Sequence, residues 1–220
     1  MSNLNDLFPN VTFGNTVQIL GVKNVEIGEG SCIGDDAWLN ICIRDDKIRM
    51  KIGKCVLIGR QSMISTGGYL EIGDYCLFAP RVYVSDAEHV FDDINQPIFQ
   101  QGATFGRSVI VEENCWFGIN TVVTGNLTVG RGSIIAANAV VKQDILPFCI
   151  MAGNPADIIK MYNPKTKKWE RAKTKKEQDK IMEARNEISI PSRSEYQTIL
   201  TQNSKLKYVE PLVAGRGISI

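Results

Sequence analysis

Residues 111–145 of this 220-residue chain read VEENCWFGINTVVTGNLTVGRGSIIAANAVVKQDI, and a six-residue repeat runs through them. Every sixth position holds an apolar side chain: Val111, Phe117, Val123, Val129, Ile135 and Val141. Three positions later come residue types that tolerate positive φ at a corner: Asn114, Asn120, Asn126, Gly132, Asn138 and Asp144. Neither the period of an α-helix nor that of a β-strand explains this rhythm. The pattern predicts a solenoid of short strands joined by tight turns, with one apolar side chain of each strand stacked inward.

Earlier runs of the same hexad divide the chain into coils. Runs of three hexads suggest a triangular coil of 18 residues, and successive coils start at Ile27, Ile52, Ile72, Val111 and Val129. These starts lie 25, 20, 39 and 18 residues apart, which leaves insertions of 7, 2, 21 and 0 residues. Every insertion follows a third hexad, so we expect all of them to emerge at one corner. A partial coil with weaker register is expected around residues 11–22.

The composition narrows the functional class. The formal net charge is +1, so no global basic field indicates a nucleic-acid partner. The chain has no run of 18 apolar residues, and its first residues lack the basic and apolar regions of a signal peptide, which predicts a cytoplasmic protein. The six cysteines contain no Cys-x-x-Cys pair and are interpreted as reduced packing residues, with a disulfide or metal role as the alternative.

The hexad rhythm stops after Lys160, which predicts a β-helix domain over residues 1–160 and a C-terminal helix with an extended tail over residues 161–220. Residues 160–185 hold ten Lys or Arg and four Asp or Glu, and good helix formers run from Trp169 to Glu187. We interpret this segment as a solvated helix that caps the open end of the solenoid. Contact with a phosphorylated ligand or an anionic membrane surface stays open as the alternative. Residues 188–220 are expected to be an arm on a neighbouring subunit or loosely ordered.

The longest insertion, the loop at residues 85–108, carries His89, which is the single histidine of the chain. A long loop without secondary structure of its own is typical of a functional segment. Histidine exchanges a proton near neutral pH, and the neighbouring carboxylates of Asp86 and Glu88 are candidates to orient its ring. His89 is therefore the first catalytic candidate.

Residues 110–120, IVEENCWFGIN, resemble the I-x-I-G-x-x-x-W-I-G-x-N segment of the hexapeptide-repeat acyltransferases, with Glu112 and Phe117 as departures from it. The stretches VVKQDILP at 140–147 and AGNPADIIK at 152–160 resemble the end of that family's coenzyme-binding coils. Asp157 stands where the family commonly has lysine. The resemblance covers roughly residues 11–162 and is nearest to the bacterial O-acetyltransferases of sugars and polysaccharides. It implies an all-β fold, a left-handed parallel β-helix.

The resemblance also implies an activity, a donor and an assembly. The donor is acetyl-CoA, no metal is needed, and the partners are a glycan or small-molecule acceptor and two further copies of the chain in a homotrimer. Each active site would lie between adjacent subunits, with membrane contact not indicated. By match to the motif, His89 would be the general base, supported by Asp86 and Glu88, and a backbone N–H at Gly118 would hold the oxyanion. Gly118 equally suits the turn chemistry of the hexad.

The remaining site residues follow from the same resemblance. Trp116 and Tyr83 are candidates to bind the acceptor, with packing at the trimer interface as the alternative for Trp116. The coenzyme candidates are small, rigid or basic residues of the last coils: Ala136, Ala137, Lys142, Gly153, Pro155 and Lys160. Cys115 falls at an inward position, so direct transfer is favoured over an acyl-cysteine intermediate.

Several functions compete. The first is O-acetylation of a sugar hydroxyl in a surface polysaccharide or its precursor. The second is N-acetylation of a nucleotide-linked amino sugar, and the third is a non-enzymatic solenoid used for assembly. An antibiotic acetyltransferase of the same fold also stays open, although the loop lacks a His-x-Met-Asp pattern. A carbonic anhydrase of this fold requires three histidines and is excluded by the single one present.

Overall fold

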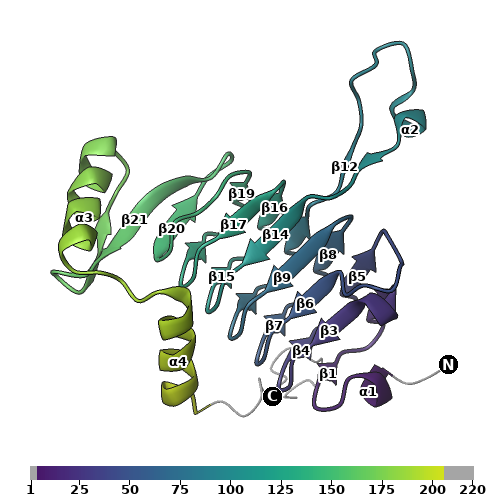
Figure 1. Ribbon diagram of the computed structural model, residues 1–220, viewed down its shortest axis with the longest axis horizontal. Coiled ribbons are helices and arrows are strands. Elements are labelled where there is room, and N and C mark those ends of the chain that lie inside the picture. Colours follow the sequence, from purple (N-terminus) through teal and green to yellow (C-terminus); the bar gives the residue numbers. More distant parts are fainter. Residues whose placement is uncertain (1–3, 206–220) are drawn as a thin grey trace, which may run out of the picture.

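Short parallel strands stack in three sheets around one core in this computed structural model, which describes residues 4–205 (Figure 1). The nine-stranded sheet contains, in order, β1 (Thr12–Phe13), β4 (Cys32–Ile33), β7 (Leu57–Ile58), β10 (Leu77–Phe78), β15 (Trp116–Phe117), β18 (Ile134–Ile135), β20 (Cys149–Ala152), β21 (Asp157–Asn163) and β22 (Lys168–Arg171). The six-stranded sheet contains β19 (Val140–Val141), β16 (Val122–Thr124), β11 (Tyr83–Ser85), β8 (Met63–Thr66), β5 (Trp38–Ile41) and β2 (Gln18–Leu20). The five-stranded sheet contains β17 (Leu127–Val129), β14 (Ser108–Val111), β9 (Tyr69–Ile72), β6 (Met50–Ile52) and β3 (Val25–Ile27).

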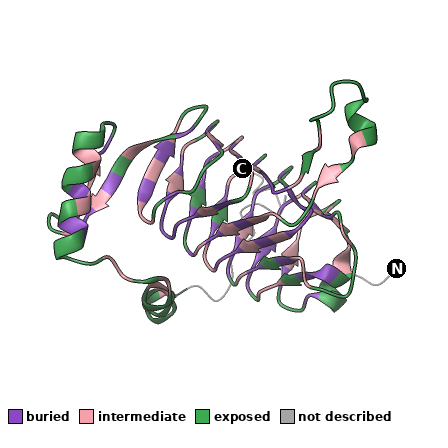
Figure 2. Ribbon diagram, turned by 45° about the horizontal axis from the view of Figure 1, so that its top comes forward, coloured by how far each residue is buried: buried purple, intermediate pink, exposed green. Residues whose placement is uncertain are grey.

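The core lies inside the triangle formed by these sheets. The apolar hexad residues of the last coils are at most 1% exposed: Val111, Phe117, Val123, Val129, Ile135 and Val141. Phe78 and Phe117 stack across neighbouring coils with ring centroids 4.4 Å apart. Figure 2 shows the buried residues recurring along each winding of the chain. The predicted inward column is confirmed.

Two of the three corners have the turn chemistry that the hexads predict. The backbone has positive φ at Asn114, Asn120, Gly132 and Asn138, with values of 56°, 59°, 64° and 60°. The prediction is wrong for Asn126 and Asp144, which belong to the third corner. Their side-chain oxygens accept hydrogen bonds from the amides of Ser108 and Thr128, at 2.8 and 2.7 Å, so these residues join coils instead of making a left-handed turn.

All insertions leave at this third corner, between the six-stranded and the five-stranded sheet, as predicted. They are residues 42–49, 67–68 and 86–107. The longest forms an arm with a two-stranded hairpin, β12 (Glu88–His89) and β13 (Ala103–Thr104), and a short helix, α2 (Ile98–Gln101). Figure 1 shows the arm projecting away from the β-helix. The N-terminal part adds α1 (Leu4–Leu7) and a 3₁₀ turn at Val22–Asn24.

The C-terminal part differs from the expectation in two places. Trp169 lies in β22 of an antiparallel hairpin, so the predicted helix begins later, as α3 (Lys175–Glu187), after Thr174 and Glu177 form a capping box. The hairpin also continues the nine-stranded sheet, so the predicted domain boundary at residue 160 falls inside β21. Helix α3 packs on β21 through Ile181 and Ala184 at the C-terminal end of the solenoid.

Residues 188–204 turn back along the β-helix, where α4 (Arg193–Asn203) lies against coils of its own chain (Figure 1). This position corrects the expectation of an arm on another subunit or a loose tail for these residues, whereas 206–220 lie outside the described residues. Among residues 4–205, no helix is both long and apolar enough to cross a membrane.

Candidate active site

His89 lies at the root of the arm, on an exposed strand. Its neighbour in the hairpin is Ala103, and its Nδ1 lies 3.4 Å from the carbonyl oxygen of Gly102. A contact of this kind holds the ring through one nitrogen and leaves the other directed elsewhere. The hairpin therefore gives the only histidine of the chain a defined and accessible position.

Neither neighbouring carboxylate has the predicted hydrogen bond to this ring. Asp86 is 1% exposed and accepts hydrogen bonds from the Thr66 hydroxyl at 2.8 Å and from the Gly67 amide at 2.6 Å. The amides of Gly68 and Tyr69 add contacts at 3.0 and 3.1 Å. Glu88 forms an ion pair with Arg107. Asp86 therefore ties the root of the arm to the preceding coil, and Glu88 ties its two strands together, instead of orienting His89.

Gly118 is needed for packing between coils. Its amide donates to the carbonyl oxygen of Ile135 at 2.8 Å, so this N–H belongs to the strand ladder and is not available for an oxyanion. A Cβ at this position would lie 2.5 Å from the backbone nitrogen of Ala137. Between the two roles that the sequence allows, these contacts support the structural one.

Four of the predicted coenzyme residues meet at one corner of the last coils. The Ala136 amide donates to the Met151 carbonyl at 2.9 Å, and the Val140 amide donates to the Gly153 carbonyl at 3.0 Å. These bonds place Ala136 and Ala137 beside the turn that contains Gly153 and Pro155. Ala137, Gly153 and Pro155 are exposed, so this corner presents small or rigid residues to solvent.

The two predicted lysines lie on other sides of the solenoid. Lys160 belongs to β21, where it pairs with Ile150 and Arg171. Lys142 follows β19 at the corner that carries the insertions. Both side chains are exposed. They therefore do not form a single basic cluster.

Trp116 and Tyr83 lie on different faces. Trp116 is 50% exposed on the outer face of the nine-stranded sheet, between Leu77 and Ile134. Tyr83 is half-buried on the six-stranded sheet, three positions before Asp86. One protomer therefore does not bring both aromatic residues and His89 around a common point.

The cysteines are mostly inert core residues. Cys115 is 1% exposed and lies 3.4 Å from the Gly130 carbonyl oxygen, so an attacking thiolate is not supported. Burial raises the pKa of the Cys149 thiol to about 11, against the opposing effect of Arg185. Cys42 is the exposed exception to the prediction of buried packing residues. Within residues 4–205, no group of three or more Cys, His, Asp or Glu is arranged to hold a metal ion.

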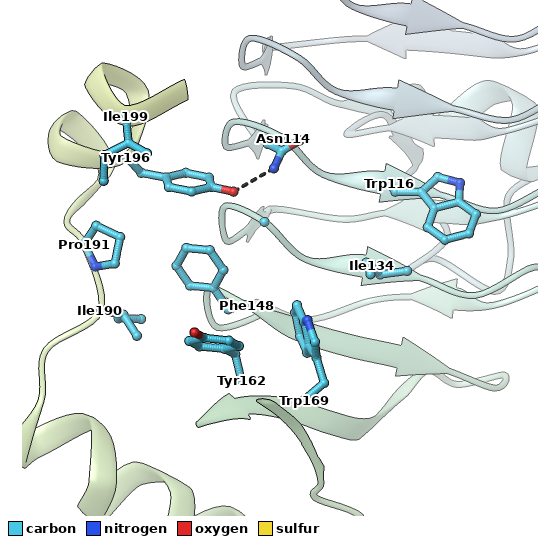
Figure 3. Close-up of a pocket in the computed structure, with 11 residues that line it drawn as sticks. Asn114, Trp116, Ile134, Phe148, Tyr162, Trp169, Ile190, Pro191, Tyr196 and Ile199 are labelled. Carbon is cyan, nitrogen blue, oxygen red and sulfur yellow. Dashed lines mark hydrogen bonds between the residues drawn. The ribbon is translucent and has the colours of Figure 1, made fainter. Parts of the chain in front are cut away.

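An apolar groove was not anticipated from the sequence. It lies between α4, the segment before it and the outer face of the nine-stranded sheet, and its cavity volume is about 500 Å³. Figure 3 shows Trp116 at one end, Tyr196 and Ile199 on the α4 side, and Phe148, Tyr162 and Trp169 along the hairpin side. The hexads indicated that Trp116 and Ile134 face outward, but no local signal indicated that a helix sixty residues later would lie against the same sheet.

Known proteins share both the repeat and the fold. Residues 108–143 match the family described as bacterial transferase hexapeptide (six repeats). A probable acetyltransferase of Mycobacterium tuberculosis is 32% identical over 139 residues, which cover 63% of this chain. The chain spans 45% of that relative's length.

Solved structures extend the likeness to most of the chain. AntD, an N-acyltransferase from Bacillus cereus solved with dTDP and 3-hydroxybutyryl-CoA, superposes with a TM-score of 0.60 at 20% identity, over 92% of this chain and 98% of that one. A putative acetyltransferase of the same organism has a TM-score of 0.53 at 17% identity, over 81% and 84% of the two chains. The fold is thus the predicted left-handed parallel β-helix with C-terminal helices. The resemblance to the hexapeptide-repeat acyltransferases is confirmed.

Proposed function

We propose that this protein is an acetyltransferase that uses acetyl-CoA and acetylates a sugar hydroxyl of a surface polysaccharide or its precursor. The observation that carries the proposal is the position of His89, exposed at the root of an anchored arm, in a chain whose repeats are 32% identical to a probable acetyltransferase. Many sites of transfer chemistry need one base with a defined position and access to solvent. This chain provides it once.

In the proposed reaction, His89 takes the proton of the acceptor hydroxyl through one ring nitrogen. The hydroxyl oxygen then forms a bond to the thioester carbonyl carbon, the carbon–sulfur bond breaks, and the thiol leaves with a proton. The Gly118 amide is engaged in the strand ladder, so the oxyanion needs a donor other than that N–H. The exposed corner around Ala137 and Gly153 allows a long thin donor to approach the backbone closely.

The proposed site lies between subunits of a homotrimer. His89 leaves from the corner between the six- and five-stranded sheets, whereas Trp116 faces outward from the nine-stranded sheet. A neighbouring copy would bring the arm of one protomer to the last coils of the next. The arm supports this arrangement, because Ile94 and Phe99 near its tip are 94% and 91% exposed and have no cover within the protomer.

N-acetylation of a nucleotide-linked amino sugar is the second candidate. The specific observation in its favour is the shared fold with AntD, which is an N-acyltransferase solved with dTDP. An amine acceptor needs less help from a base once it is unprotonated. The two candidates therefore differ in the acceptor that responds and in its dependence on His89.

The test measures thiol release from acetyl-CoA with a panel of sugar hydroxyl and amino-sugar acceptors, for the wild type and His89→Ala. Release that depends on a hydroxyl acceptor and falls by about 10²–10⁴-fold in the variant supports the proposal. Release only with amino sugars supports the second candidate. Equal release by both proteins removes His89 from the chemistry, and no release with any acceptor overturns the enzymatic proposal in favour of a structural solenoid.

A further inference from the structure

The apolar groove between α4 and the nine-stranded sheet has a composition unlike that of the proposed transfer site. Its lining consists of aromatic and aliphatic side chains with one amide and one glycine: Asn114, Trp116, Gly132, Ile134, Phe148, Tyr162, Trp169, Ile190, Pro191, Tyr196 and Ile199. No charged side chain is among them. The volume of about 500 Å³ is typical of a small-molecule site, which ranges over roughly 300–1,000 Å³.

The wall formed by α4 is held in place by polar contacts outside the cavity. Arg193 donates to Glu113 at 2.8 Å and to Glu71 at 2.5 Å, and the Glu113 side chain is 3% exposed. Arg131 donates through Nε to the Pro191 carbonyl at 2.8 Å. The groove is therefore formed before any ligand arrives, which reduces the entropy lost on binding.

The polar groups in the groove already have partners. The Asn114 side-chain amide donates to the Tyr196 hydroxyl at 2.6 Å, as Figure 3 shows. The rings pack edge to face, with centroids 5.0 Å apart for Phe148 and Tyr196 and 5.9 Å apart for Tyr162 and Trp169. A phosphate or a carboxylate would lose its hydration here without gaining a cation. An uncharged apolar group gains contact with rings on both sides of the groove.

The groove ends at the proposed transfer site. Trp116 lines its far end and lies on β15, whose next residues, Phe117 and Gly118, lead to the corner beside Ala137. A substrate held at that corner has its apolar extension directed along the sheet, past Ile134 and toward α4. The two regions are thus continuous along one face of the solenoid.

We propose that this groove is a subsite for an uncharged apolar group, an alkyl chain or a plain ring, that is attached to one of the substrates. The inference rests on the proposed function and extends it to the substrate class. The same chemistry has two sources. It is either the acyl chain of a donor longer than acetyl or the hydrophobic portion of a lipid-linked or alkylated sugar acceptor.

The experiment compares long and short substrates in two arms. In the donor arm, octanoyl-CoA and acetyl-CoA are compared with one hydroxyl acceptor. In the acceptor arm, octyl and methyl glycosides of one sugar are compared with acetyl-CoA. The ratio of kcat/KM for the long over the short substrate is measured in the wild type, in Ile199→Trp, which fills the groove from α4, and in Ile188→Trp. The last is a matched control, because Ile188 and Ile199 are 47% and 43% exposed and only Ile199 lines the groove.

We expect the long substrate to be preferred by about tenfold or more in one arm, and that arm identifies the source. The preference should be lost in Ile199→Trp and kept in Ile188→Trp. Binding is also read without turnover, as quenching of tryptophan fluorescence by octyl glucoside below its micelle concentration, which should be weaker in Ile199→Trp. This binding assay distinguishes the two failures.

Thiol release without chain preference, together with no binding difference between the variants, overturns the groove proposal and leaves the proposed function intact. Octyl glucoside binding that Ile199→Trp weakens, in a protein that releases no thiol from any donor, overturns the proposed function and supports an apolar site. A wild type in which neither arm prefers the long substrate but acetyl transfer is strong also counts against the groove as a substrate subsite.

Discussion

At the scale of single residues, the carboxylate of Asp86 illustrates how a polar group can serve structure beside a candidate active site. It is 1% exposed, and it accepts four hydrogen bonds from Thr66, Gly67, Gly68 and Tyr69. Its proximity in sequence to His89 suggests a catalytic partner, but side chains separated by an odd number of residues on extended backbone point to opposite sides. The contacts therefore assign Asp86 to the anchor of the arm.

We predict that Asp86→Asn lowers the free energy of unfolding by about 1.5–3 kcal/mol, because an amide NH₂ cannot accept from the donors that the second carboxylate oxygen satisfies. Glu88→Gln is the control, since its ion pair with Arg107 is partly exposed and is expected to contribute only about 0–1 kcal/mol. Urea unfolding measures both values. Equal midpoints for Asp86→Asn and the wild type would contradict the anchoring role.

At the scale of elements, α4 is held on the β-helix by few apolar contacts and several polar ones. Arg193 bridges Glu71 and Glu113, Tyr196 contacts Asn114, and Gln197 Nε2 lies 3.3 Å from Asp74. Despite the opposing effect of burial, the hydrogen bonds from Glu71 and Glu113 raise the pKa of the Arg193 guanidinium, which therefore stays charged. The docking of α4 thus depends mainly on one cation between two carboxylates.

We predict that Arg193→Ala releases α4, because Glu113 would then be a buried carboxylate without a cation. Hydrogen exchange of the amides in residues 193–203 should become at least about tenfold faster, which corresponds to a loss of roughly 1.4 kcal/mol. Arg171→Ala is the control, since its ion pair with Glu177 is exposed and lies on the other side of the hairpin. Unchanged protection of α4 in Arg193→Ala would show that apolar contacts alone hold the helix.

At the scale of the whole molecule, the protomer leaves apolar surface uncovered at the arm and on two faces of the solenoid. Ile94 and Phe99 are exposed on the arm, Leu77 and Trp116 on the nine-stranded sheet, and Met63 on the six-stranded sheet. Exposed apolar patches of this kind mark interaction surfaces. They agree with an assembly in which the arm of one copy covers a face of the next.

We predict that the wild type has a mass of three times 24.4 kDa in light scattering. The double variant Ile94→Asp with Phe99→Asp should dissociate it and reduce thiol release, because charges at the arm tip prevent apolar contact with a neighbour. Ile188→Asp, at the end of α3, is the control and should keep the assembled mass. A monomeric wild type that is fully active would overturn the proposal of a site between subunits.

The hexads alone determined the core and the corner of insertion. Because each coil repeats one pattern of apolar and turn residues, a strand such as Trp116–Phe117 has a predictable inward residue and a predictable neighbour above and below. The same reasoning placed His89 on the one long insertion. These inferences succeed because solenoid contacts join residues at nearly constant separation along the chain.

The tertiary structure decided what contacts of irregular separation determine. It showed that the Gly118 amide is bound to Ile135, that Asp86 anchors the arm, and that Trp169 belongs to a strand. It also placed α4 against coils formed up to 122 residues earlier, as in the Arg193–Glu71 pair, and so created the apolar groove. No periodic pattern specifies such a contact, because it depends on where a non-repeating segment finds complementary charge and apolar surface in the folded chain.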